Sequence, residues 1–245
     1  MATRNERQRT AGRTAAGRTA AGRAADAASA VKAARRPEVR LPGLVAWEGG
    51  ELEPDGDYDG LEFADLDLAG QEGVGARFMD CALRRCALDE AGLAKARVLD
   101  SVLDGVRGVG TDLSGASLRD VELLEPRLGG AQLHGAVLER VLVRGGKIDY
   151  LNLRTARLKD VVFDGCVLVE PDFGGAVLER VEFRGCVVRG ADFTGARMTD
   201  VDLRAASELG IARGVEALAG AVISPAQLFE LAPALAAQLG VRVVG

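Results

Sequence analysis

Residues 161–200 read VVFDGCVLVEPDFGGAVLERVEFRGCVVRGADFTGARMTD and carry a large apolar residue at every fifth position. These positions are Phe163, Leu168, Phe173, Leu178, Phe183, Val188, Phe193 and Met198. An α-helix repeats its buried face every 3.6 residues and a half-buried strand every 2 residues, so neither element presents this pattern to one core. The spacing predicts a repeating architecture whose unit is five residues long.

The five-residue frame continues far beyond this stretch. It runs unbroken from Phe63 to Leu203, and only Gly73 and Gly108 interrupt its apolar series. The last residue of each unit is often glycine, as expected where a tight turn requires positive φ. A second period of 20 residues overlies the first, visible in the quarters ARVLD, AVLER and ARLKD. The two periods together predict four-sided coils, about seven of them between residues 61 and 200, stacked into a rod.

The units TDLSG (111–115), PDFGG (171–175) and ADFTG (191–195) resemble the A(D/N)LXX repeats of pentapeptide-repeat proteins. The resemblance covers about 145 residues of the chain. It implies an all-β fold, the right-handed quadrilateral parallel β-helix of that family. One large side chain on each side of a coil would then point inward, which accounts for the period of five.

Composition divides the chain of 245 residues into four segments. Residues 1–40 hold ten basic and three acidic residues and almost no bulky apolar ones, so we expect a disordered basic Ala/Arg-rich tail. This tail is either a solvated extension or a weak, non-specific contact for nucleic acid or another acidic surface. Residues 41–60 hold six acidic and no basic residues and form an acidic N-terminal cap or linker. The β-helix is expected over 61–204 and a C-terminal cap over 205–245.

The C-terminal cap contains the signals of one helix. Ser224 and Gln227 have capping-box spacing, which predicts that a helix begins here. Pro233 is expected to break or restart this helix, and Gly240 is expected to end it. The residues VRVV at 241–244 are expected to form a last strand.

Leucines of the predicted helix fall on one apolar face. They are Leu228, Leu231, Leu235 and Leu239. This face either plugs the end of the rod or also joins two rods into a homodimer, as C-terminal helices do in dimeric members of the family that the repeats resemble. At the other end, Trp47 is expected to lie across the first coil, because a solenoid must cover its terminal strand edges.

Residues 20 apart are neighbours on stacked coils, so outward-facing columns can be read from the sequence. One corner column alternates in charge through Asp120, Arg140, Asp160, Arg180 and Asp200. Alternating columns of this kind favour a structural interpretation, in which ion pairs fix the register of the coils. A surface that binds a charged partner would instead carry one sign over many coils.

Two outward-facing groups are candidates for partner binding. The basic group on one coil comprises Arg144, Lys147, Tyr150, Asn152 and Arg154. The apolar group comprises Val162, Val167, Val169 and Val187, because exposed apolar surface marks interaction sites. Each group also has a structural interpretation, as charge compensation for acidic coils and as β-propensity on a solvated side.

The sequence offers no recognisable catalytic or cofactor site. His134 is the only histidine, and the outward positions beside it do not supply a nucleophile, base and carboxylate together. Cys166 and Cys186 occupy small inward positions, and none of the four cysteines forms a CxxC pair. We therefore expect a non-enzymatic protein without metal or cofactor, located in the reducing cytoplasm. No run of about 20 apolar residues predicts a membrane span.

Two functions remain open from the sequence. The first is a repeat scaffold that binds a macromolecular partner, of unknown identity, through the sides of the rod. The second is a DNA-mimic modulator of DNA gyrase, which the resemblance implies because quinolone-resistance members are acidic dimeric rods. The charge between residues 61 and 200 is patchy and shows no continuous acidic stripe, which favours the first.

Overall fold

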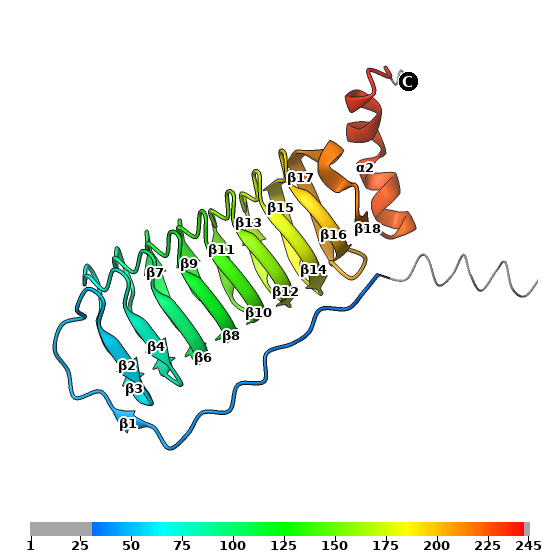
Figure 1. Cartoon of the computed structure of the whole chain (residues 1–245). Coiled ribbons are helices and arrows are strands. Elements are labelled where there is room, and N and C mark those ends of the chain that lie inside the picture. The colour runs from blue at the N-terminus through cyan, green and yellow to red at the C-terminus, as the bar shows by residue number, and fades with distance from the viewer. Residues whose placement is uncertain (1–30, 243–245) are drawn as a thin grey trace, which may run out of the picture. The chain divides into compact units, whose positions relative to one another are not determined.

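The computed structural model describes residues 31–242, and from Lys32 onward these residues belong to one compact unit (Figure 1). The tail prediction for residues 1–30 lies outside the described residues, as does the second half of the strand predicted at 241–244. The first half of that prediction is wrong, since Val241 and Arg242 do not form a strand. Across the described part, no helix combines the length and the apolarity needed to cross a bilayer.

The unit is a parallel β-solenoid, as the repeat predicts. Each strand pairs in parallel with the equivalent strand of the next coil, 20 residues further along the chain. Leu138 therefore lies opposite Leu158, and Leu158 lies opposite Leu178. One sheet has 12 strands and wraps two sides of each coil, and the second sheet has 6 strands on the next side. Most of the remaining side is joined by isolated bridges such as Gln132 to Asn152, and at its C-terminal end Ala191 pairs with Ile211.

The strands of the large sheet from the middle of the rod onward are β6 (Arg97–Asp104), β8 (Ser117–Leu124), β10 (Val137–Arg144), β12 (Arg157–Asp164), β14 (Val177–Arg184) and β16 (Arg197–Asp202). The N-terminal strands of the same sheet are β1 (Val45–Ala46), β2 (Asp57–Asp59), β3 (Leu61–Ala64), β4 (Arg77–Met79) and β5 (Ala82–Arg84). The small sheet contains β7 (Arg107–Val109), β9 (Arg127–Gly129), β11 (Lys147–Asp149), β13 (Val167–Val169), β15 (Val187–Asp192) and β17 (Glu208–Arg213).

We number the sides of a coil by residues 61–65, 66–70, 71–75 and 76–80 and their equivalents at 20-residue spacing. The first and fourth sides thus belong to the large sheet, the second side is the small sheet, and the third side carries the isolated bridges. At the corners the chain turns through positive φ even where no glycine is present, as at Asp120 (54°) and Asp160 (57°). The frame of five is therefore fixed by turn geometry as well as by the core.

The core is a column of side chains from the predicted inward positions. Phenylalanine rings one coil apart stack at a centroid distance of 5.0 Å, both for Phe163 with Phe183 and for Phe173 with Phe193. All four rings are at most 1% exposed. The interior is filled by buried apolar side chains, whose burial supplies most of the folding free energy of a solenoid.

Both ends of the solenoid are covered. Strand β1 pairs with β3, and the Trp47 ring lies 4.9 Å from the Phe63 ring, which places the tryptophan over the first coil. At the other end are η1 (Val215–Leu218), β18 (Ala221–Val222) and α2 (Pro225–Gln238). The Gln227 side-chain amide donates to the Leu203 carbonyl at 2.8 Å, which ties α2 to the last complete coil.

The structure confirms the predicted start of α2 and corrects its middle. Ser224 and Gln227 form a complete capping box, and Gly240 follows the helix end with a φ of 73°. The expected break at Pro233 is wrong, since the helix continues through this residue. Pro233 and Phe229, whose carbonyl loses its helical donor, are both exposed, so water can satisfy that carbonyl.

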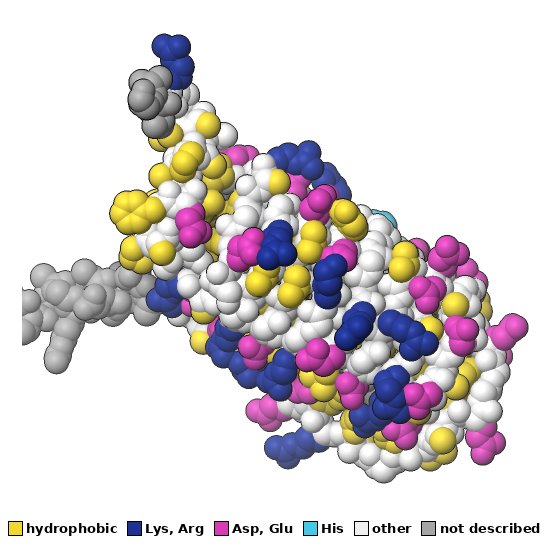
Figure 2. Space-filling model, turned by 180° about the vertical axis from the view of Figure 1, so that it is seen from behind, with side chains coloured by type: hydrophobic (Ala, Val, Ile, Leu, Met, Phe, Trp, Pro, Cys, Tyr) yellow, Lys and Arg dark blue, Asp and Glu magenta, His cyan; other side chains and the backbone are white. Residues whose placement is uncertain are grey.

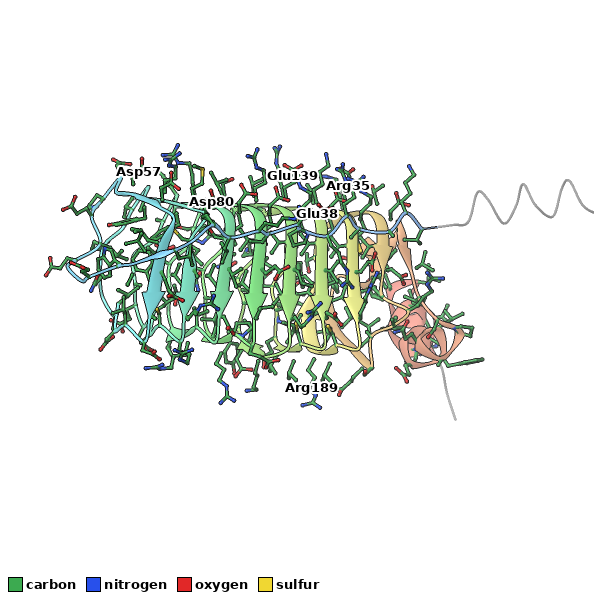
Figure 3. The ribbon with its side chains drawn as sticks, turned by 90° about the horizontal axis from the view of Figure 1, so that it is seen from below. Arg35, Glu38, Asp57, Asp80, Glu139 and Arg189 are labelled. Carbon is green, nitrogen blue, oxygen red and sulfur yellow. The ribbon has the colours of Figure 1, made fainter. Side chains whose placement is uncertain are left out.

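Residues 32–40, which we call the arm, were expected to belong to the disordered tail, but the structure places them against the rod. In Figure 3 the arm crosses successive coils, with Arg35 and Glu38 on it and Arg189 at the opposite edge. Lys32 contacts Asp200, Arg35 contacts Asp160, and the chain then leads to β1 beside β3. The arm therefore runs antiparallel to the coil progression over most of the rod. The signal that the tail composition missed is the Arg35-Arg36-Pro37 segment, which finds acidic partners on coils far away in sequence.

Candidate partner-binding surfaces

The structure disperses the predicted basic group over several sides of its coil. Arg144 lies on the first side, beside Asp164 at 3.6 Å, and Lys147 lies on the second side in β11. Tyr150 stands at the corner between the second and third sides and is 58% exposed. Asn152 and Arg154 lie on the third side and bond to Gln132 and Asp172. These five residues therefore do not form one site.

The predicted apolar group is split in the same way. Val167, Val169 and Val187 are half-buried neighbours on the second side, in β13 and β15. Val162 points outward on the first side but is fully buried, which corrects its predicted exposure. The reason is the arm, which crosses this side between its contacts with Asp160 and Asp164.

Lys147 belongs to a column of cations that sequence reasoning missed. It pairs in register with Arg127, and Arg127 pairs with Arg107, so three positive side chains stack on consecutive coils of the second side. The next residues of the same column are Val167 and Val187. The 20-residue spacing of 107, 127 and 147 is the signal that would have found this column. We call Arg107, Arg127 and Lys147 the cationic column.

A surface hollow of about 760 Å³ lies along the cationic column. Gly129 contributes to it because a side chain is missing between Val109 and Asp149, its register neighbours. Three carboxylates also line the hollow, namely Asp89, Glu125 and Asp149.

The carboxylates of the hollow are already engaged. Asp89 accepts from the Val109 amide at 3.0 Å, Glu125 accepts from the Gly146 amide at 3.1 Å, and Asp149 forms an ion pair with Lys147. Arg127, in contrast, has no ion pair within residues 31–242. Its guanidinium group is exposed at the centre of the column and is available to an incoming anion.

Ion pairs between coils occur where the alternating corner column predicts them. Arg140 contacts Asp120 at 2.7 Å and Arg180 contacts Asp160 at 2.6 Å. Each arginine also pairs with the glutamate that precedes it, Glu139 or Glu179. These contacts fix the register of the coils and neutralise the corner between residues 120 and 180.

The residues considered for catalysis or metal binding do not assemble into one site, although the Cys166 and Cys186 thiols are neighbours on successive coils. His134 is exposed on the third side. All four cysteines are buried free thiols, and burial raises the pKa of Cys81 and of Cys86. In the described part of the chain, no group of three or more His, Cys, Asp or Glu residues is arranged to hold a metal ion.

The predicted leucine face of α2 is divided between two environments. Leu231 is buried and Leu235 half-buried, whereas Leu228 is 49% and Leu239 81% exposed. Phe229, which the sequence interpretation did not include, is 80% exposed. Figure 2 shows hydrophobic side chains projecting from this helix. The helix therefore has one apolar face toward the rod and a second one toward solvent.

The chain is similar to proteins of known structure. One of them is HetL, a pentapeptide repeat protein involved in heterocyst differentiation regulation in the cyanobacterium Nostoc. The two chains are 19% identical, the match covers 71% of this chain and 92% of HetL, and the TM-score is 0.37. The chain also resembles QnrB1, a plasmid-mediated fluoroquinolone resistance protein, in its full-length form, with 15% identity, 74% and 99% coverage, and a TM-score of 0.28. No curated protein matches the sequence significantly.

Two family models match the sequence directly. The pentapeptide repeat region matches residues 76–153, and the model of pentapeptide repeats in nine copies matches residues 154–207. Together they cover more than half of the chain, in the segment that forms the solenoid. The chain belongs to the pentapeptide repeat family.

Proposed function

We propose that the protein is a non-enzymatic scaffold that binds a macromolecular partner through the second side of its solenoid. The cationic column is the observation that supports this proposal. Like charges placed opposite each other on neighbouring strands are destabilising, whereas the corner column alternates in sign from Asp120 to Asp200. Lys147 pairs with Asp149 and Arg107 donates to the Arg85 carbonyl, but neither contact compensates Arg127, and the stacked positive charge is best accounted for by a ligand of opposite charge.

The shape of the second side defines what kind of partner fits. The cationic column leads directly into the half-buried valines Val167 and Val187, so charged and apolar surface adjoin. An acidic protein surface that ends in an apolar patch complements this arrangement in both respects. The guanidinium groups of Arg107 and Arg127 are suited to carboxylates, which they can bind in a bidentate manner.

A charge-reversal experiment tests this surface. The variant Arg107→Glu, Arg127→Glu, Lys147→Glu is compared with the wild type as bait for affinity capture from the native host, with quantitative mass spectrometry. The matched control is Arg97→Glu, Arg157→Glu, Arg197→Glu, which changes the charge equally at three exposed positions on the fourth side. We expect partners to be lost with the first variant only. Equal capture by the two variants would contradict a binding role of the second side.

We also propose that two rods associate through α2. Its solvent-facing apolar residues, Leu228, Phe229 and Leu239, would be covered in a homodimer. Replacing Phe229 with Asp should convert a dimer to a monomer in sedimentation velocity without changing the far-UV circular dichroism of the rod. A wild-type chain that sediments as a monomer at 50 μM, on the order of a weak dimer's dissociation constant, contradicts this association.

DNA mimicry toward gyrase is the second candidate function, supported by one acidic corner. Asp80, Asp100 and Asp120 occupy consecutive positions of the column that later alternates in sign, and burial together with Asp120 and Asp80 raises the pKa of Asp100. The acidic run covers three coils only, and the face seen in Figure 2 has no continuous acidic stripe. ATP-dependent supercoiling by gyrase, titrated with the full chain, tests this function. Inhibition that disappears in Asp80→Asn, Asp100→Asn, Asp120→Asn would favour mimicry over the scaffold.

A further inference from the structure

The first side of the rod holds the arm by side-chain contacts that follow one another along both chains. The Lys32 amide donates to Asp200 at 3.2 Å, and the Ala34 amide donates to Glu182 at 2.7 Å. One coil further on, the Arg35 amide donates to Asp160 at 3.1 Å. The backbone of the rod is used for pairing between coils, so the rod contributes carboxylates and the arm contributes its backbone N–H groups.

Arg35 and Arg36 add the charge component of this contact. The Arg35 guanidinium donates to Asp160 from Nε at 3.1 Å and from Nη2 at 2.9 Å. Arg36 lies 4.0 Å from Asp164, which belongs to the same strand as Asp160, β12. Two consecutive cationic side chains of the arm therefore meet two carboxylates of one strand, Asp160 and Asp164.

The floor beneath the arm is apolar. Leu142 and Val162 point outward on the first side, yet they are 3% and 0% exposed. Pro37 is buried in the same stretch of the arm. Because outward positions of a solenoid are otherwise in contact with solvent, these residues require a covering segment, and proline in an extended chain supplies apolar surface with little loss of entropy.

The carboxylates at the rim are unusual for a surface. The Asp160 side chain is fully buried and the Glu182 side chain is 6% exposed. Arg180 and Arg184 of the rod pair with these two carboxylates, and the arm supplies further N–H and guanidinium donors, so this strip is complementary to an extended, arginine-containing segment and disfavours an acidic one. The first side thus has the parts of a peptide-binding groove, namely an apolar floor and acidic rims whose carboxylates accept from the backbone N–H groups of the bound segment.

We propose that the first side is a recognition groove for an extended arginine-containing segment of a partner protein, and that residues 32–37 are its tethered occupant. Tethering gives the arm a high effective concentration, so a free segment enters only when the arm is withdrawn or out-competed. In the isolated chain the arm would then fill the groove, and a partner that binds the arm would expose it. This inference is independent of the second side and of its cationic column.

The test uses the full-length chain and a labelled peptide. Arg35→Ala, Arg36→Ala weakens the arm in place, and fluorescein-labelled VKAARRPEVR, the sequence of residues 31–40, is titrated into it and followed by fluorescence anisotropy. We expect the peptide to bind this variant at least tenfold more tightly than it binds the wild type. A peptide with glutamate in place of both arginines should not bind. The matched control chain, Arg85→Ala, Arg189→Ala, removes ion pairs with Asp65 and Glu208 elsewhere and should behave like the wild type.

A second measurement separates a closed groove from a damaged rod. Hydrogen exchange of residues 32–40 should accelerate in Arg35→Ala, Arg36→Ala while the core strands keep their protection, which shows that the rod is intact. Adding Asp160→Asn to that variant should then weaken peptide binding severalfold. Two results would overturn the proposal: equal peptide affinity for the wild type and the arm variant, or no binding to an arm variant whose core protection is unchanged.

Discussion

Arg35 and Asp160, 125 residues apart in sequence, are joined by three hydrogen bonds of 2.9 to 3.1 Å. Arg180 from the next coil donates two more to the same carboxylate, at 2.6 and 2.9 Å. Asp160 is therefore a buried anion between two guanidinium groups, one from the repeat and one from outside it. Burial alone raises the pKa of Asp160, but the hydrogen bonds from Arg180 and Arg35 outweigh it and hold this pKa well below the usual range.

The first prediction concerns Arg35 itself. Replacing Arg35 with Ala removes the guanidinium contact with a buried carboxylate, although Arg180 still compensates the charge. We expect a loss of about 1 kcal/mol in the free energy of unfolding, at the lower end for charged hydrogen bonds because the Arg35 side chain is 62% exposed. Urea denaturation measures this loss. A decrease above about 4 kcal/mol, the range for buried ion pairs, would mean that the arm is part of the folding core and not a segment laid on it.

The second prediction is the acid response of the arm. Because the folded pKa of Asp160 lies below its unfolded value, its contribution is complete above the unfolded pKa and is lost as the pH falls through the folded pKa. Stability should therefore decline as the pH is lowered from about 4, near the unfolded pKa of aspartate. Asp160→Asn should flatten this decline in denaturation curves recorded between pH 2 and 7. An unchanged pH slope in that variant would show that other carboxylates account for it.

The third prediction has the opposite sign and concerns Asp100. Its pKa is raised, first by burial and then by Asp120 and Asp80, so the charged form is disfavoured in the folded state. The resulting penalty is absent below the unfolded pKa and is complete once the pH exceeds the folded pKa. Asp100→Asn should raise stability at pH 7 by about 0.2–1 kcal/mol, as for relief of like charges on neighbouring strands, and by less at pH 3. Thermal melts at the two pH values measure the difference.

The fourth prediction addresses the stacked rings of the core. Replacing Phe173 with Ala leaves a cavity beside Phe193 and Phe183, with which its ring is in contact. The expected loss is about 3–5 kcal/mol, as for large-to-small substitutions of buried aromatic residues. Calorimetry should show a lower melting temperature for this variant. A loss below about 1 kcal/mol would require the coils to collapse around the gap.

The fifth prediction separates function from stability on the second side. Arg127→Val removes the central charge of the cationic column and places a β-branched residue next to Val109 in the adjoining column. We expect the melting temperature to stay unchanged or to rise, because like-charge repulsion is relieved and valine favours strands. Partner binding through the second side should fall at the same time. A clear loss of stability in Arg127→Val would instead assign Arg127 a structural role.

The sequence predicts the core and the start of α2 but neither the course of α2 through Pro233 nor the positions of the basic residues. The inward frame from Phe63 to Leu203 and the start of α2 at Ser224 follow from local rules of packing and capping, and the structure agrees with them. Continuation of the helix through Pro233 does not follow, because an exposed carbonyl can exchange its helical partner for water. The predicted basic coil failed as one site because a turn after every fifth residue sends Arg144, Lys147 and Arg154 to different sides.

The sequence by itself determined the solenoid, because a period of five within a period of 20 places one large side chain on the inside of each of four sides of a coil. It also determined the columns on the outside, including the cationic column at 107, 127 and 147, once the period is applied to polar residues. Only the tertiary structure decided where the arm lies. Arg35 meets Asp160 through a contact that has no period, because the arm is outside the repeat and its position depends on charge and shape matched across 125 residues. That contact buries Val162 and turns the first side from an open surface into a filled groove.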